Sequence, residues 1–215
     1  MSKQALIICN GEPPSRALSR RLARESALVV AVDGGANIAR RHGIKPDIII
    51  GDLDSVSRST LRFFSTSTIL YVSRQDNTDL EKALDLLAAR KIRKALIISA
   101  IGKRIDFTLG NLSVLWAYTS FVDITFIGDG WKAISVGRKK VVKTRVGTTV
   151  SLIPYGDCSG ITLKGLRYPL KNAMMKVGEI GASNVVRSSP FTVVVKRGKM
   201  LLILLDKTVG TGKKS

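Results

Sequence analysis

The 215-residue sequence is poor in several residue types that carry common chemistries. It has 2 cysteines, 1 histidine, 6% aromatic residues, and only 16 acidic residues against 35 basic ones. Two cysteines, Cys9 and Cys158, cannot build a disulfide framework and fit a reducing cytosol, so we expect a cytoplasmic protein. One histidine with two distant cysteines also excludes a zinc site of ordinary ligand spacing.

Long hydrophobic runs are missing as well. No apolar run approaches the roughly 18 residues that a membrane span needs, and the longest, at residues 200–205, has the length of a strand. Hydrophobic residues make up 45% and charged residues 24%, which is a globular composition and excludes wholesale disorder. We therefore expect a folded protein with no membrane partner.

The shortage of acids gives a formal net charge of +19 that is spread unevenly. Residues 1–128 hold 18 basic and 12 acidic residues, and residues 129–215 hold 17 basic and 4 acidic residues. The second part is thus the more basic, with a net charge of +13 against +6. Such a balance fits a polyanionic partner, and it equally fits a solvated basic surface.

The pattern of apolar residues changes near position 128 and predicts two domains. Before it, short β-branched runs alternate with helical periods, which predicts a mostly parallel α/β domain at 1–128. The predicted strands cover residues 5–9, 27–32, 47–50, 68–72, 95–100 and 122–127, and the predicted helices cover 15–25, 78–90 and 108–120. After it, short β-rich segments between turn residues predict an all-β sandwich or barrel at 129–215.

Acidic residues follow two of the predicted strands directly. Asp33 ends one strand, and Asp52 and Asp54 end the next. Open parallel sheets bind ligands at the carboxyl ends of their strands, and Gly34, Gly35 and Gly51 let backbone approach a bulky ligand. Two carboxylates on one side of an extended segment favour a cation between them, and Mg²⁺ prefers carboxylates plus substrate phosphates. The alternative is a turn in which the aspartates bind only backbone N–H groups.

Two further polar segments fit a phosphate site. Residues 75–79 lead into a helix that Thr78 or Asp76 would cap. The segment can also supply a third carboxylate to the same metal, and both interpretations can hold together. Residues 102–106 place Lys103 and Arg104 after a strand, which suits phosphate contact. A surface ion pair between Arg104 and Asp106 is the alternative interpretation.

Two other functions compete. Residues 48–56 resemble the nucleophile motif of haloacid-dehalogenase-type phosphatases, in which Asp52 would be the nucleophile. The basic second half motivates a nucleic-acid-binding module without enzymatic activity. However, no recognition element is evident and aromatic residues are sparse, so we expect no specific nucleic acid partner.

Taken together, the ordered segments resemble the thiamine pyrophosphokinase family over nearly the whole chain. They lie at residues 10–13, 33–37, 46–55, 75–84, 102–106, 151–154, 165–170 and 183–184. The resemblance implies an α/β ATP-binding domain, a β-sandwich domain, and a homodimer with thiamine at the subunit interface. It implies the reaction of ATP and thiamine to AMP and thiamine diphosphate, with Mg²⁺ as cofactor.

The resemblance also implies roles for individual residues. The metal candidates are Asp52, Asp54 and Asp79, and the thiamine candidates are Ser183 and Asn184. The catalytic candidates are Asp33, Asp54, Asp79, Arg104 and Asp106. The ATP candidates are Gly34, Gly35, Gln75, Thr78, Lys103 and Arg104.

Two positions depart from the family pattern near residue 104. Lys103 replaces a glycine, and Phe107 replaces the usual histidine or another polar residue. A third departure follows Asn184, where Val185 and Val186 stand and some family members carry an aromatic residue that stacks on thiamine. Stacking on thiamine would need another aromatic residue here, such as Tyr168 or Trp131.

Overall fold

The computed structural model describes residues 4–73 and 76–206. The chain divides into two compact units, Met1–Gly128 and Asp129–Ser215. Helices and strands alternate in the first, whereas the described part of the second is built of strands. The predicted mixed α/β class is confirmed. No helix in the described ranges has both the length and the apolar character needed to cross a membrane.

The first unit contains six strands and five helices among its described residues. The strands are β1 (Gln4–Ile8), β2 (Leu28–Val32), β3 (Ile48–Gly51), β4 (Thr68–Tyr71), β5 (Lys94–Ile98) and β6 (Asp123–Gly128). The helices are α1 (Arg16–Arg24), α2 (Gly35–His42), α3 (Arg58–Phe63), α4 (Asp79–Ala89) and α5 (Ile105–Tyr118).

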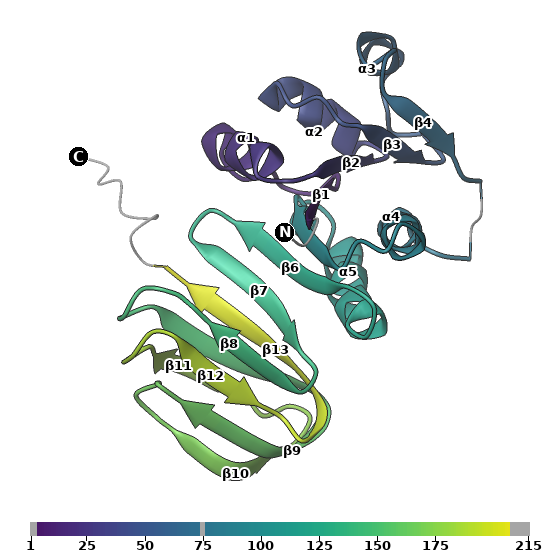
Figure 1. The fold of residues 1–215 in the computed structure, drawn as a ribbon. Helices are drawn as coiled ribbons and strands as arrows, with labels where there is room; N and C mark the ends of the chain where they lie inside the picture. Colours follow the sequence, from purple (N-terminus) through teal and green to yellow (C-terminus); the bar gives the residue numbers. More distant parts are fainter. Residues whose placement is uncertain (1–3, 74–75, 207–215) are drawn as a thin grey trace. The chain divides into compact units, whose positions relative to one another are not determined.

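The six strands of the first unit pair in the order β4-β3-β2-β1-β5-β6, and every pair is parallel. The chain runs outward from β1 to β4 and then returns to β5 beside β1. Because such crossovers are right-handed, α1–α3 cover one face of the sheet and α4 and α5 cover the other (Figure 1). The connections therefore diverge at β1 and β5.

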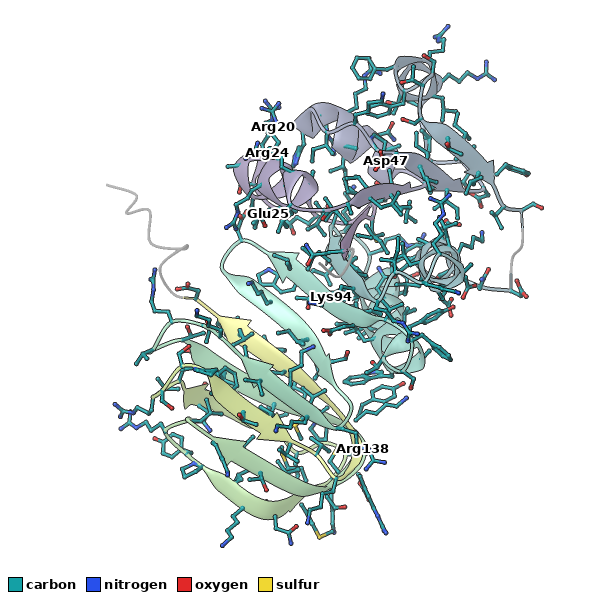
Figure 2. The ribbon with its side chains drawn as sticks, viewed as in Figure 1. Arg20, Arg24, Glu25, Asp47, Lys94 and Arg138 are labelled. Carbon is teal, nitrogen blue, oxygen red and sulfur yellow. The ribbon has the colours of Figure 1, made fainter. Side chains whose placement is uncertain are left out.

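Buried aliphatic side chains form the core of this unit, as parallel strands covered on both faces require. Leu6, Ala31 and Ile49 are fully buried in neighbouring strands. Helix α1 begins where Ser15 Oγ accepts a hydrogen bond from the N–H of Leu18. Asp47, labelled in Figure 2, accepts a hydrogen bond from the N–H of Val29 at 2.7 Å and so joins β2 to the start of β3.

Helices α2 and α3 were not among the predicted helices, and two other elements differ from the predictions. Strand β4 is not a buried strand: it lies at the edge of the sheet, and the side chains of Ile69 and Tyr71 are exposed. Helix α5 begins at Ile105, ahead of the predicted start at residue 108. The extended backbone of Arg104, the N-cap residue, marks this start, although its side chain makes no capping hydrogen bond. Asp106 in the first turn suits the positive end of the helix dipole.

The second unit contains antiparallel strands arranged around one long strand, β9 (Thr149–Lys164). The others are β7 (Trp131–Val136), β8 (Lys139–Val142), β10 (Leu170–Met175), β11 (Gly181–Val185), β12 (Phe191–Val194) and β13 (Arg197–Leu205). Strand β9 pairs with β10, β11, β12 and β13, while β7 pairs with β13 and β8 pairs with β12. Their apolar side chains meet in one core that includes Val150, Phe191 and Leu202.

Candidate active site

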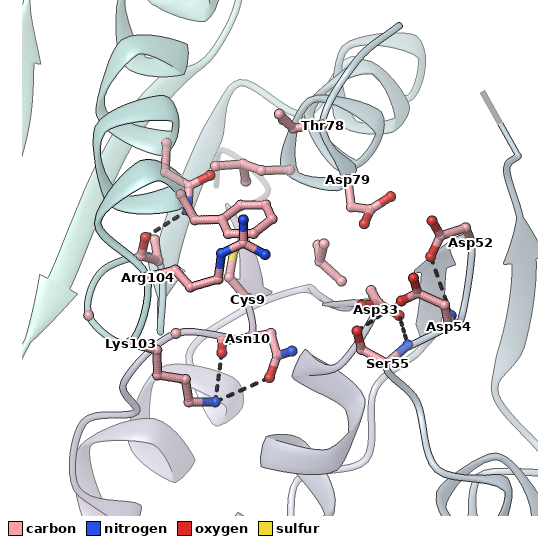
Figure 3. Close-up of a pocket in the computed structure, with 17 residues that line it drawn as sticks. Cys9, Asn10, Asp33, Asp52, Asp54, Ser55, Thr78, Asp79, Lys103 and Arg104 are labelled. Atoms are coloured by element: carbon pink, nitrogen blue, oxygen red, sulfur yellow. Dashed lines mark hydrogen bonds between the residues drawn. The ribbon is translucent and has the colours of Figure 1, made fainter. Parts of the chain in front are cut away.

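A cavity of about 410 Å³ opens in the first unit at the carboxyl ends of its strands. It lies where β1 and β5 are neighbours and their connections diverge, which is the point at which open α/β sheets bind ligands. Its volume lies within the roughly 300–1,000 Å³ of small-molecule sites. Figure 3 shows the polar side chains around it, which include Asn10, Asp33, Asp52, Asp54, Ser55, Thr78, Asp79, Lys103 and Arg104.

Three carboxylates gather on one side of this pocket. Asp33 follows β2, and Asp52 and Asp54 follow β3, so the parallel pairing of these strands brings them together. One oxygen of each lies within 4.8 Å of the others. The N–H of Ser55 donates to Asp33 Oδ1 at 3.2 Å, and the hydroxyl of Ser55 donates to Asp54 Oδ1 at 2.8 Å.

Gly51 makes the close approach of β2 and β3 possible at this point. Its φ of 146° lies in a region that other residues rarely adopt, and a Cβ there would lie 3.1 Å from the Cβ of Asp33. A side chain at Gly51 would thus push Asp33 away from Asp52 and Asp54.

The carboxyl group of Asp33 is buried, with 8% of the residue exposed. Burial raises its pKa above the ordinary value of 3.8, and the nearby charge of Asp54 raises it further. Hydrogen bonds from Gly34 and Ser55 act in the opposite direction. A cation beside the three carboxylates would relieve both the burial and the repulsion, and their hard oxygen donors fit Mg²⁺.

Asp79 lines the same pocket but does not belong to the close group of three carboxylates. It occupies the first turn of α4, which Thr78 and Glu81 begin with a reciprocal capping box. Lys82 holds one of its carboxylate oxygens: Lys82 Nζ donates to Asp79 Oδ1 at 2.7 Å. Figure 3 shows the Asp79 carboxylate directed toward the side of the pocket where Asp52 and Asp54 lie.

Two cations stand across the pocket from the three carboxylates (Figure 3). Lys103 Nζ donates to the carbonyl oxygen of Asn10 at 2.8 Å. The guanidinium group of Arg104 pairs with both oxygens of Asp106 and lies 4.3 Å from the ring centroid of Phe107. This exposed pairing raises the pKa of Arg104 and lowers the pKa of Asp106. Asp106 itself does not line the cavity.

Gly34 and Gly35 have a packing role that the sequence did not reveal. A Cβ at Gly34 would lie 2.2 Å from Asn10 Nδ2, and one at Gly35 would lie 2.0 Å from the carbonyl oxygen of Ile8. Neither glycine lines the cavity. Because these two glycines have no side chain, the end of β1 and the residues after it can pack closely against the start of α2.

Sequence reasoning gave no role to several residues that line the cavity, among them Cys9 and Asn111. Burial, and to a lesser extent the charge of Asp79, raises the pKa of Cys9 to about 12, so its thiol is protonated and is not a nucleophile near neutral pH. Asn111 Nδ2 donates to the carbonyl oxygen of Ala100 at 2.7 Å and fastens α5 to the end of β5. Its position one helical turn after Phe107 is the signal that could have identified it.

The remaining predicted site residues lie elsewhere. Gln75 falls outside the described residues. Ser183 and Asn184 belong to β11 of the second unit. Asn184 is buried, its Oδ1 accepts from the N–H of Tyr168 at 3.0 Å, and its Nδ2 donates to the carbonyl oxygen of Tyr168 at 2.8 Å. The amide of Asn184 is thus engaged with backbone, whereas Ser183 and Tyr168 are exposed.

Comparison with known proteins gives a consistent result. The family model described as "Thiamin pyrophosphokinase, catalytic domain" matches residues 19–126, and "Thiamin pyrophosphokinase, vitamin B1 binding domain" matches residues 138–200. Thiamine pyrophosphokinase 1 of Arabidopsis thaliana is 28% identical over 96% of this chain and 88% of its own length. Thiamine pyrophosphokinase of Bacillus subtilis is 28% identical over 83% of this chain and 87% of its own length.

Solved structures show the same fold. The crystal structure of thiamine pyrophosphokinase from Bacillus subtilis matches with a TM-score of 0.85 and 24% identity, covering 95% of this chain and 100% of that chain. Thiamin pyrophosphokinase from Candida albicans matches with a TM-score of 0.83 and 19% identity, covering 95% and 90%. Because the catalytic-domain model alone covers half of the sequence, this chain belongs to the thiamin pyrophosphokinase family.

Proposed function

We propose that this chain transfers the pyrophosphoryl group of ATP to the hydroxyl group of thiamine, giving thiamine diphosphate and AMP. The observation that carries the proposal is the close group of carboxylates formed by Asp33, Asp52 and Asp54. The group lines the cavity at the carboxyl ends of the strands, and the chain that contains it belongs to the thiamin pyrophosphokinase family. Lys103 and Arg104 across the pocket supply cations for a triphosphate. Family membership also disfavours the phosphatase and the non-enzymatic module.

The residues of the pocket have different roles in this transfer. The thiamine hydroxyl oxygen bonds to the β-phosphorus, and the bond from that phosphorus to the bridging oxygen of AMP breaks. Arg104 and Lys103 stabilise the negative charge on the phosphate oxygens, and Asp33 orients the attacking hydroxyl and accepts its proton. The transition state is loose, so orientation matters more than the strength of the base.

We propose that Mg²⁺ is the cofactor and that Asp52, Asp54 and Asp79 hold it, with Asp33 as a neighbouring carboxylate. The short distances within the group of Asp33, Asp52 and Asp54 and their oxygen donors support this assignment. For Asp79 the support is its place in the pocket and the single oxygen that Lys82 leaves available. When bound, Mg²⁺ neutralises charge on the phosphates.

We also propose that the second unit is a β-sandwich and that the chain forms a homodimer. Thiamine would bind to this unit at the interface between the two subunits. Its match to the vitamin B1 binding domain and its single enclosed core support this description. Ser183 presents an exposed hydroxyl, and Asn184 acts by fixing the backbone of Tyr168. The ring of Tyr168 is exposed, and the guanidinium group of Arg167 lies 5.6 Å from its centroid, which leaves the other face for stacking. The two free cysteines, both buried, agree with a cytoplasmic location.

The proposal is tested by incubating the purified protein with ATP, Mg²⁺ and thiamine and separating the products. We expect AMP and thiamine diphosphate in equal amounts, and no AMP when thiamine is left out. Release of inorganic phosphate without AMP would instead support a phosphatase that uses Asp52. Sedimentation at several concentrations tests the homodimer separately.

A further inference from the structure

The helices on the two faces of the first unit's sheet differ sharply in charge. Helices α1, α2 and α3, which share one face, contain eight arginines and no aspartate or glutamate. Helices α4 and α5 on the other face contain four acidic residues and one lysine. We call the first group the arginine face; its members are Arg16, Arg20, Arg21, Arg24, Arg40, Arg41, Arg58 and Arg62.

The substrates of the proposed reaction do not account for the arginine face. The cavity is lined by Lys103 and Arg104, and none of the eight arginines is among its lining residues. The helices pack side by side, α1 on α2 and α2 on α3, and so form one continuous layer of helices (Figure 1). Figure 2 shows Arg20 and Arg24 along α1.

Two of the eight arginines help to build the layer. Arg20 Nε donates to the carbonyl oxygen of His42 at 2.6 Å and ties α1 to the end of α2. Arg40 Nη1 donates to Ser59 Oγ at 2.9 Å and ties α2 to α3. For the other six, no carboxylate within residues 4–73 and 76–206 forms an ion pair. With respect to those described residues, their guanidinium groups keep donors for an external anion.

The local potential of this face is positive. His42, at the end of α2, has its pKa lowered first by burial and then by the charges of Arg16, Arg41 and Arg20. Glu25 and Asp47 are nearby acids in the sequence, and Asp47 already accepts a hydrogen bond from the N–H of Val29. The three helices themselves contain no acidic residue that could balance the positive charges of the arginines.

The chemistry of the face favours a phosphodiester backbone over a lipid surface. Every cation on the three helices apart from His42 is arginine, whose planar fork binds phosphate oxygens in pairs. Membrane-surface helices also need an apolar side, but α1 buries Leu22 against the core. Within these three fully described helices, Phe63 is the one exposed large hydrophobic side chain, and the guanidinium group of Arg40 lies 4.9 Å from its ring centroid.

We propose that the arginine face binds the sugar–phosphate backbone of nucleic acid without sequence preference, as an activity separate from the enzymatic one. The binding is electrostatic, since base-reading side chains such as Asn and Gln are nearly missing from the three helices; Asn37 is their single amide, and its Nδ2 donates to the carbonyl oxygen of Ser55. The binding affinity therefore falls steeply as the salt concentration rises. On duplex DNA, the slope of log K against log salt concentration is about −0.9 for each phosphate contact.

The test uses the full-length protein and a fluorescent duplex of about 20 base pairs, titrated between about 50 and 200 mM salt. The variant is Arg16→Gln/Arg24→Gln/Arg41→Gln. The matched control, Arg138→Gln/Arg187→Gln/Arg197→Gln, removes three exposed arginines from the second unit. We expect the first variant to weaken duplex binding at least about tenfold and to lower the salt slope by about 3, with a much smaller change in the control.

Three outcomes would overturn the proposal. One is an equal loss of affinity in the control variant, which would mean that overall charge explains the binding. Another is an unchanged salt slope in the first variant. The third is binding to vesicles containing phosphatidylserine with no binding to the duplex, which would identify a lipid surface. Both variants should keep the wild-type Tm and wild-type turnover of ATP and thiamine, so a failure here is distinguishable from failure of the proposed function.

Discussion

The ammonium group of Lys82 donates to Asp79 Oδ1 at 2.7 Å and to the carbonyl oxygen of Val72 at 3.1 Å. One buried cation thus joins the residue after β4 to the first turn of α4, with only 5% of its side chain exposed. Asp79 keeps its second oxygen for the pocket that it lines. Lys82 therefore fixes the orientation of a carboxylate that the proposed reaction uses, without being part of the cavity wall itself.

Replacing Lys82 with methionine should lower kcat by about 10- to 100-fold, because Asp79 loses the partner that orients it. The KM for thiamine should change little. The Tm should also fall, since a partly buried carboxylate is left unpaired. Steady-state kinetics and thermal unfolding measure these effects.

The double variant Lys82→Met/Asp79→Asn separates this role from simple packing. Removing the charge of Asp79 as well should raise the Tm above that of Lys82→Met, and the kcat should be no lower than that of Asp79→Asn alone. Strictly additive losses of Tm and of log kcat would contradict the coupling.

Asp54→Asn should lower turnover by about 10³-fold or more, because it removes a proposed metal ligand from the group with Asp33 and Asp52. The Tm should not fall, since the substitution also removes a repulsive charge beside Asp33. Glu25→Gln, which removes an exposed acid at the end of α1, serves as the control and should keep wild-type kinetics. A near-normal rate for Asp54→Asn would exclude it as a ligand.

The buried carboxyl group of Asp33 predicts a pH dependence of stability in metal-free protein. Because its pKa is raised in the folded state, the unfolded chain loses this proton first as pH rises above the ordinary value of 3.8. The folded state therefore loses stability through that window and stays less stable at neutral pH. Asp33→Asn should remove this cost while keeping the acceptor for the N–H of Ser55.

Thermal unfolding in EDTA at a series of pH values checks the sign of this effect. The Tm of Asp33→Asn should exceed that of the wild type at neutral pH, and the difference should shrink as pH approaches 3.8. A wild type that is more stable than the variant at neutral pH would show that the hydrogen bonds to Asp33 outweigh its burial.

Much of the first unit could be predicted from local patterns. Buried β-branched runs identified its strands, and acids placed directly after those strands identified the pocket that contains Asp52 and Asp54. These inferences succeed because a parallel sheet imposes one direction on its strand ends. The edge position of β4 was missed because Ile69 and Tyr71 have the composition of a buried strand.

Contacts between residues distant in sequence account for what local patterns missed. Asp33 lies in the close group of carboxylates because β2 and β3 pair in a register that requires Gly51. Lys82 is identified as the partner of Asp79 only when its burial is known, since lysine in a helix is ordinarily a solvated residue. The packing role of Gly34 depends on Asn10, from a different strand end.

Asn184 should act on thiamine binding through Tyr168. Its amide satisfies both the N–H and the carbonyl group of that residue, so Asn184→Ala removes two hydrogen bonds and should destabilise the second unit by about 1–3 kcal/mol. The KM for thiamine should rise by roughly tenfold, with a small change in kcat, because a displaced Tyr168 weakens a contact shared by ground and transition states.

Ser183→Ala is the matched control for stability: its side chain is exposed, so the Tm should be retained even where thiamine affinity falls. Urea unfolding and thiamine titrations measure both quantities, and an unchanged KM in a destabilised Asn184→Ala protein would mean that Tyr168 takes no part in binding thiamine.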